Sequence, residues 1–112
     1  MRFLSIWRPA ASNSGPPTQE HMQAMGALVQ EMMANGSLIV TEPLGPLEAG
    51  ARIESQGGRS TVSALTDRAG GYALIQAPSK EACMELMTRF FAVAGDGVCE
   101  LRQIVDMAPP QG

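Results

Sequence analysis

The single histidine of the chain, His21, is the residue best suited by type to acid–base chemistry. Histidine is the side chain whose ordinary pKa lies nearest neutral pH, so it can both accept and donate a proton there. Glu42 ends a β-rich run just before a proline and supplies a carboxylate that can orient such a base. We therefore take His21 as the candidate general base and Glu42 as its catalytic partner. The alternative is a solvated histidine in a first helical turn and a carboxylate in a turn.

Three other residues have side chains suited to holding a small ligand. Trp7 and Tyr72 are amphipathic aromatic residues that can line a pocket, and the alternative for both is packing in the core. Arg102 can anchor an anion, or it can pair with Glu100 across a dimer. These side chains allow only acid–base reactions, such as isomerisation, lyase action or dehydration of a small polar or aromatic acid.

No pattern in the sequence indicates a metal or a cofactor. One histidine does not make a histidine-based metal site without help from carboxylates. Cys83 and Cys99 fall in apolar stretches typical of buried thiols. Gly95-Asp96-Gly97 lacks the third glycine of a nucleotide-binding loop and follows a helix instead of a strand. We expect no metal and no cofactor.

Length and charge restrict the class of protein. The 112 residues suit one domain, which we place at residues 1–108, with 109–112 as a flexible tail. A net charge of −3 with a single lysine argues against nucleic-acid binding. No run approaches the ~20 apolar residues of a membrane span. The apolar run at the N-terminus is too short for a signal peptide, so we expect a cytoplasmic protein.

Hydrophobic periodicity predicts the elements that must position the candidate residues. Two helices begin after the capping residues Thr18 and Ser79 and end near Asn35 and Gly95, where glycines follow. Gly57-Gly58 separates two polar β-prone runs and indicates an exposed hairpin. The remaining strands are predicted at residues 2–7, 38–41, 72–77 and 98–106.

This order is β-α-β-β-α-β with an inserted hairpin, which is the ferredoxin-like unit of α+β proteins. Two helices then cover one face of an antiparallel sheet, and the other face, partly apolar, is left open. An open apolar face usually has a partner. Only 17% of the residues are charged, compared with about 25% in an average domain. We therefore predict a homodimer packed sheet to sheet as a dimeric α/β barrel, with His21 facing the dimer cleft.

Several segments resemble YCII-related proteins, in particular the branch named for its Asp-Gly-Pro-Phe (DGPF) motif. They are Met1–Ile6, Gln19–Met22, Asn35-Gly36 with Leu38–Val40, Gly70–Ile75 and Ser79–Ala82. The resemblance covers nearly the whole chain and implies a dimeric α/β barrel. It also implies a catalytic pair of a histidine near the start of the first helix and an acidic neighbour, as proposed for one branch. Some DGPF proteins accompany alternative sigma factors.

The chain departs from this family where the DGPF turn should follow the hairpin. It has Ser63–Arg68 there, in which only Asp67 can supply the acid. Two functions therefore stand side by side. The first is binding of a small molecule, with or without acid–base catalysis, in a cleft of a homodimer. The second is a non-catalytic regulatory or protein-interaction module associated with transcription regulation. A closed, polar-lined cleft containing His21 favours the first, and a flat or filled interface favours the second.

Overall fold

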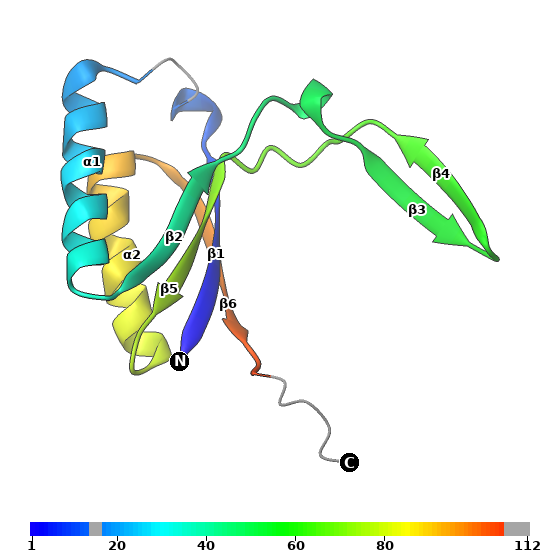
Figure 1. Cartoon of the computed structure of the whole chain (residues 1–112). Coiled ribbons are helices and arrows are strands. Elements are labelled where there is room, and N and C mark those ends of the chain that lie inside the picture. The colour runs from blue at the N-terminus through cyan, green and yellow to red at the C-terminus, as the bar shows by residue number, and fades with distance from the viewer. Residues whose placement is uncertain (14–16, 107–112) are drawn as a thin grey trace, which may run out of the picture.

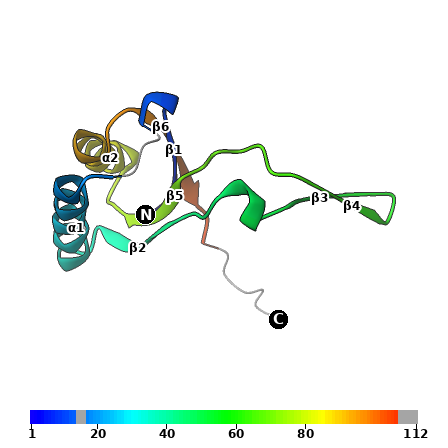
Figure 2. The same cartoon turned by 90° about the horizontal axis from the view of Figure 1, so that it is seen from above.

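The computed structural model describes residues 1–13 and 17–106 and has one four-stranded antiparallel sheet with two helices on one face (Figures 1 and 2). The spatial order of the strands is β2-β5-β1-β6. This confirms the predicted α+β, ferredoxin-like β-α-β-β-α-β fold with an inserted hairpin. The tail predicted at residues 109–112 lies outside the described residues. The main elements are β1 (Arg2–Pro9), α1 (Gln19–Ala34), β2 (Leu38–Pro43), β5 (Gly71–Gln76), α2 (Lys80–Ala94) and β6 (Gly97–Ile104).

Side-chain caps set the starts of both helices, as the sequence predicts. The Thr18 hydroxyl accepts a hydrogen bond from the backbone N–H of His21 at 3.1 Å. Ser79 accepts one from the backbone N–H of Ala82, also at 3.1 Å. Because each cap satisfies a backbone donor that the first helical turn leaves free, it stabilises the helix there by about 1 kcal/mol. The first cap therefore fixes His21 in the opening turn of α1.

The core lies between the sheet and the two helices. Ile75 of β5 and Cys83 of α2 are completely buried, and Phe3 of β1 is almost so. Burial raises the pKa of the Cys83 thiol above its ordinary value, and burial has the same effect on Cys99. Both cysteines are free thiols in the structure. Their position agrees with the interpretation of these residues as small core hydrophobes.

Within residues 1–13 and 17–106, no helix lies over the opposite face of the sheet (Figure 2). Leu4 of β1 lies opposite Leu74 of β5, and Ile6 lies opposite Tyr72. Side chains alternate between the two faces of a strand, and Phe3 and Ser5 are buried under the helices. Leu4, Ile6, Tyr72 and Leu74 therefore project from the uncovered face, where they are half-buried. This surface is partly apolar, as the sequence predicts.

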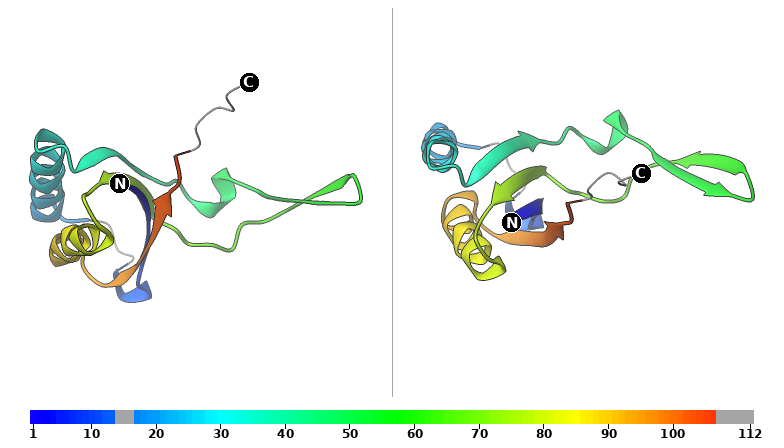
Figure 3. Two further views of the ribbon diagram at one scale, coloured as in Figure 1. Left: turned by 90° about the horizontal axis from the view of Figure 1, so that it is seen from below. Right: turned by 60° about the horizontal axis from the view of Figure 1, so that its bottom comes forward.

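The inserted hairpin, residues 52–63, forms a long projection that we call the arm. It consists of β3 (Arg52–Gln56) and β4 (Arg59–Ser63), and every residue of both strands is exposed. Gly57 and Gly58 have φ of 58° and 80°, values that favour glycine and let two residues close the turn. The arm extends away from the sheet on the side opposite the helices (Figures 2 and 3). The radius of gyration is accordingly 16.7 Å, against about 13 Å for a compact chain of this length.

The structure differs from the sequence-based expectation at a few element boundaries. Two short 3-10 helices, Ala11–Asn13 and Leu47–Ala49, were not predicted. The last strand spans Gly97–Ile104 instead of residues 98–106, because its ladder begins where Gly97 pairs with Pro9 of β1. Neither helix in the described part of the chain has the length and apolar character needed to span a membrane.

Candidate functional site

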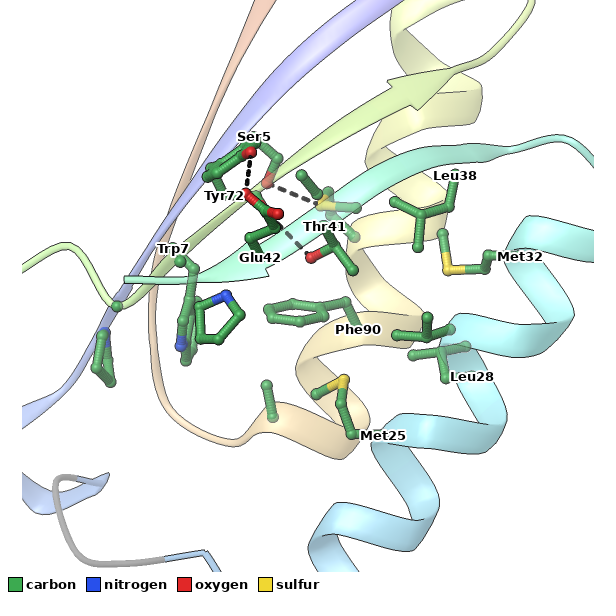
Figure 4. A pocket seen from close by; sticks show the side chains of 18 of the residues that line it. Ser5, Trp7, Met25, Leu28, Met32, Leu38, Thr41, Glu42, Tyr72 and Phe90 are labelled. Atoms are coloured by element: carbon green, nitrogen blue, oxygen red, sulfur yellow. Dashed lines mark hydrogen bonds between the residues drawn. The ribbon is translucent and has the colours of Figure 1, made fainter. Parts of the chain in front are cut away.

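A pocket of about 800 Å³ lies between α1 and the helix-facing side of the sheet (Figure 4). Trp7 and Thr41 line it from the strands, Met25 and Leu28 from α1, and Phe90 from α2. Small-molecule sites usually have volumes of about 300–1,000 Å³ and a mostly apolar lining. The pocket is built within one chain, on the side of the sheet opposite the uncovered face. This location differs from the cleft at a dimer interface that the sequence predicts.

Three aromatic rings form one wall beside this pocket. The ring centroid of Trp7 lies 5.2 Å from those of both Phe90 and Phe91, in edge-to-face arrangements. Pairs of this geometry contribute about 0.5–1.5 kcal/mol beyond the burial of their surface. Gly97 makes room for the Trp7 ring, because a Cβ at this position would clash with it. Trp7 thus lines the pocket and also packs against Phe90, which itself packs against the core.

His21 is the polar pocket residue whose functional group is least engaged. It is half-buried, and the cap with Thr18 uses only its backbone N–H. No hydrogen bond within residues 1–13 and 17–106 involves its imidazole. The hydroxyl of Ser5, by contrast, lies 2.7 Å from the Cys99 sulfur, and that of Thr41 donates to the Tyr72 carbonyl oxygen at 3.0 Å. The imidazole is therefore free to bond a ligand.

Glu42 and Tyr72 border the pocket but bond to each other. The Tyr72 hydroxyl donates to a Glu42 carboxylate oxygen at 2.6 Å. Thr41 pairs with Ala73, which packs against the core, so the neighbouring pair, Glu42 and Tyr72, projects toward the uncovered face. The structure does not bring the Glu42 carboxylate into a hydrogen bond with His21. The carboxylate instead holds the pKa of Tyr72 above its usual range, because the neutral phenol keeps this hydrogen bond.

We expect the ionisation of Tyr72 to report the contact with Glu42 directly. Tyr72 is the only tyrosine, so the tyrosinate absorbance of the protein titrates a single group. In Glu42→Gln the pKa of Tyr72 should fall toward the ordinary value of 10.0. A raised folded-state pKa means that the contact stabilises the fold below pH 10 and that this stabilisation is lost at more alkaline pH. Equal titration midpoints in the two proteins would show that the hydrogen bond has no energetic effect.

The predicted anion anchor, Arg102, lies outside the pocket. It is exposed and sits opposite Leu4 in the ladder, on the uncovered face. Arg8, on the same face, is engaged with carboxylates: it binds both carboxylate oxygens of Asp67 at 2.9 Å and Glu100 at 2.6 Å. The Arg8 guanidinium lowers the pKa of Asp67 below its ordinary value. Arg8 was not among the residues predicted for the site, although its alternation with Trp7 in β1 places it on this face.

Within the described residues, no group of three or more histidine, cysteine, aspartate or glutamate side chains is placed to hold a metal ion. The side chain of the pocket best suited to acid–base chemistry is the imidazole of His21. Most of the residues that line the pocket are apolar, and an apolar environment strengthens each hydrogen bond that a ligand makes there.

Comparisons with known proteins agree with the fold. No protein-family model matches the sequence, and neither does any curated protein. A solved structure, 5-chloro-2-hydroxyhydroquinone dehydrochlorinase (TftG) from Burkholderia phenoliruptrix AC1100 in complex with 2,5-dihydroxybenzoquinone, matches with a TM-score of 0.53. The identity is 16%, and the match covers 94% of each chain. The chain shares the fold of this enzyme. At this identity the likeness shows the fold alone, and no family model supports the resemblance to YCII or DGPF proteins.

Proposed function

We propose that this protein binds a small, mostly apolar ring compound in the pocket between α1 and the sheet and transforms it by acid–base chemistry. The observation that carries this proposal is the imidazole of His21 at the edge of an apolar pocket, without a hydrogen-bond partner among the described residues. A ring lying along the wall of Trp7 and Phe90 would place a polar substituent near the imidazole. That the structurally similar dehydrochlorinase binds a dihydroxybenzoquinone supports a ligand of this kind.

The methionines of the pocket suit a ligand of variable shape. Met22 and Met25 line it from α1, and the unbranched, polarizable methionine side chain adapts to irregular apolar surfaces.

In the proposed reaction His21 takes a proton from the bound ring compound and returns it to a different atom, or to a leaving group. Both outcomes conserve the electrons of ligand and protein, so isomerisation and elimination need no further reactant. We retain His21 as the base, and Glu42 is engaged with Tyr72.

We also propose that two copies pack through the uncovered sheet face to form a dimeric α/β barrel. Leu4, Ile6 and Leu74 provide its apolar centre, and Arg102 and Glu100 lie at its rim. A stable interface of this type buries on the order of 1,500 Å² in total. Because the pocket lies on the other side of the sheet, each copy carries a complete set of the pocket residues named here. The free thiols of Cys83, which is buried, and Cys99, which is partly buried, suit the reducing cytoplasm.

A thermal-shift screen of ring compounds tests the proposed ligand class. The panel includes 2,5-dihydroxybenzoquinone, simple hydroxylated benzenes and non-aromatic acids of similar size. A ligand present at 100 times its Kd stabilises the folded state by about 2.7 kcal/mol, which raises the melting temperature by several degrees. We expect such shifts with ring compounds and not with the non-aromatic acids.

Two substitutions on α1 show whether the pocket is responsible. Met22 lines the pocket and Met33 does not, and both side chains are about half exposed. Met22→Trp should narrow the pocket and abolish the shift, whereas the matched control Met33→Trp should preserve it. Equal shifts in both variants, or no shift with any ring compound, would refute the proposed ligand site.

The non-catalytic regulatory module is the second candidate. It is favoured by the engagement of Glu42 with Tyr72, which leaves His21 without an acidic partner within the described residues. This alternative predicts a thermal shift without chemical change of the ligand, so product analysis of the same mixtures separates the two functions.

A further inference from the structure

The two faces of the arm differ in chemical character. Ile53 pairs with Val62 in the ladder, and Ser55 pairs with Ser60, so these four residues share one face, which we call the uncharged face. The opposite face is polar and includes an ion pair between Arg52 and Glu54 at 3.0 Å. Alternation of this kind is typical of a strand whose apolar side is covered by protein.

Nothing in the described part of the chain covers the uncharged face. Ile53 and Val62 are 68% and 71% exposed. A two-stranded hairpin without further packing is marginally stable in water, so an arm of this kind needs a surface to lie on. Ile53 and Val62 together present a continuous cross-strand apolar pair to that surface.

The segments that lead into and out of the arm are anchored to the rest of the chain, whereas both strands of the arm are exposed. Leu65 packs against the backbone of Gly50, where an added Cβ would lie 2.6 Å from the leucine side chain. The bidentate ion pair between Arg8 and Asp67 ties the returning segment to β1. These contacts give the arm a defined direction, away from the helices (Figure 3).

That direction brings the arm beside any molecule covering the open face of the sheet. Packed sheets lie about 10 Å apart, and a five-residue strand is about 17 Å long, so the arm reaches past the thickness of a second sheet. A second copy that packs on the open face therefore also contacts the arm. In a two-fold symmetric dimer the same contact occurs twice, once for the arm of each copy. The arm carries two arginines and one glutamate, whereas the whole chain has a net charge of −3, so arm and partner body also differ in sign.

We infer that the arm clasps a second copy of this chain, with the face formed by Ile53, Ser55, Ser60 and Val62 lying on the body of the partner. This inference rests on the homodimer of the proposed function and adds the contact that holds it together. The arms contribute four apolar side chains to the dimer, two from each copy. They stabilise the association from outside the sheet-to-sheet contact.

Sedimentation velocity over a dilution series tests the clasp. In Ile53→Ser/Val62→Ser the apolar pair is lost, and we expect the dimer Kd to rise roughly 100-fold or more, because four buried branched side chains are removed. The matched control is Glu54→Ser/Thr61→Ser, which alters the register pair on the opposite face. Its Kd should stay close to that of the wild type. All four side chains are exposed in the single chain, so the melting of the body reports that both variants fold.

Amide hydrogen exchange of residues 52–63 gives a second readout. In the wild type these amides should exchange more slowly as the protein concentration rises through the dimer Kd, and in Ile53→Ser/Val62→Ser they should not. A wild type that stays monomeric at all concentrations would overturn both the homodimer and the clasp. A dimer whose Kd and arm exchange are the same in wild type and Ile53→Ser/Val62→Ser would overturn the clasp alone, leaving the sheet-to-sheet dimer in place.

Discussion

Replacing His21 with alanine should lower the turnover of the pocket's substrate by about 10²–10⁴-fold, which is what a general base contributes. The same change should leave the melting temperature almost unaltered. The imidazole is half-buried and makes no hydrogen bond with the described residues, while the backbone N–H that bonds Thr18 is kept by alanine. Steady-state kinetics should show the loss mainly in kcat, because the ring of the ligand still has its apolar wall.

Gln23→Ala is the matched control for this prediction. Gln23 is exposed on the same helix and does not line the pocket, so its loss should change neither turnover nor ligand binding. If His21→Ala keeps full turnover, His21 is not the general base, and this result would favour the non-catalytic regulatory module.

Gly97→Ala should be strongly destabilising although it adds a single methyl group. The added Cβ would lie 2.6 Å from the carbonyl oxygen of Arg8 and would also meet the ring of Trp7. A backbone oxygen in a ladder cannot turn away as a flexible side chain can, so the two strands must separate locally. Overpacking of this kind costs about 1–3 kcal/mol. For a domain of this size we expect the melting temperature to fall by roughly 5–20 °C.

Gly26→Ala provides a control of opposite sign. Gly26 lies inside α1 with nothing within 4 Å of an added Cβ, so alanine should stabilise the helix by about 0.5–1 kcal/mol. Thermal denaturation of the two variants therefore separates a glycine required by packing from one that is not. In Gly97→Ala the displaced Trp7 should also weaken ligand binding. If Gly97→Ala has the same melting temperature as the wild type, the Trp7 ring and the β1 backbone can accommodate a methyl group at position 97, and the predicted clash does not occur.

The parts of the fold that depend on local chemistry could be predicted from the sequence. Thr18 and Ser79 cap the two helices, and Gly57-Gly58 closes the hairpin, because each of these residues acts within a few positions of itself. Alternation also divides β1 into two faces, and the structure shows that the face with Phe3 and Trp7 is the one toward the helices.

The composition of the candidate site depends on register and could be predicted only in part. The bond between Glu42 and Tyr72 follows from the pairing of β2 with β5, which shifts at an irregularity between Leu38 and Val40. No local pattern in the sequence announces that shift. The pairing of Arg8 with Asp67 likewise joins residues 59 positions apart. Residue type alone identified His21, Trp7 and Tyr72, all of which border the pocket.

The central place of β1 has a consequence for how the chain folds during synthesis. β1 leaves the ribosome before its two ladder partners, β5 and β6, which are made only after residue 70. Until then both ladder partners of β1 are missing, and the sheet that buries Phe3 in the folded protein has not formed. Contacts so far apart in sequence slow folding. The sheet can therefore close only once translation has passed β6, and an incomplete chain exposes an unpaired β1 to association with other chains.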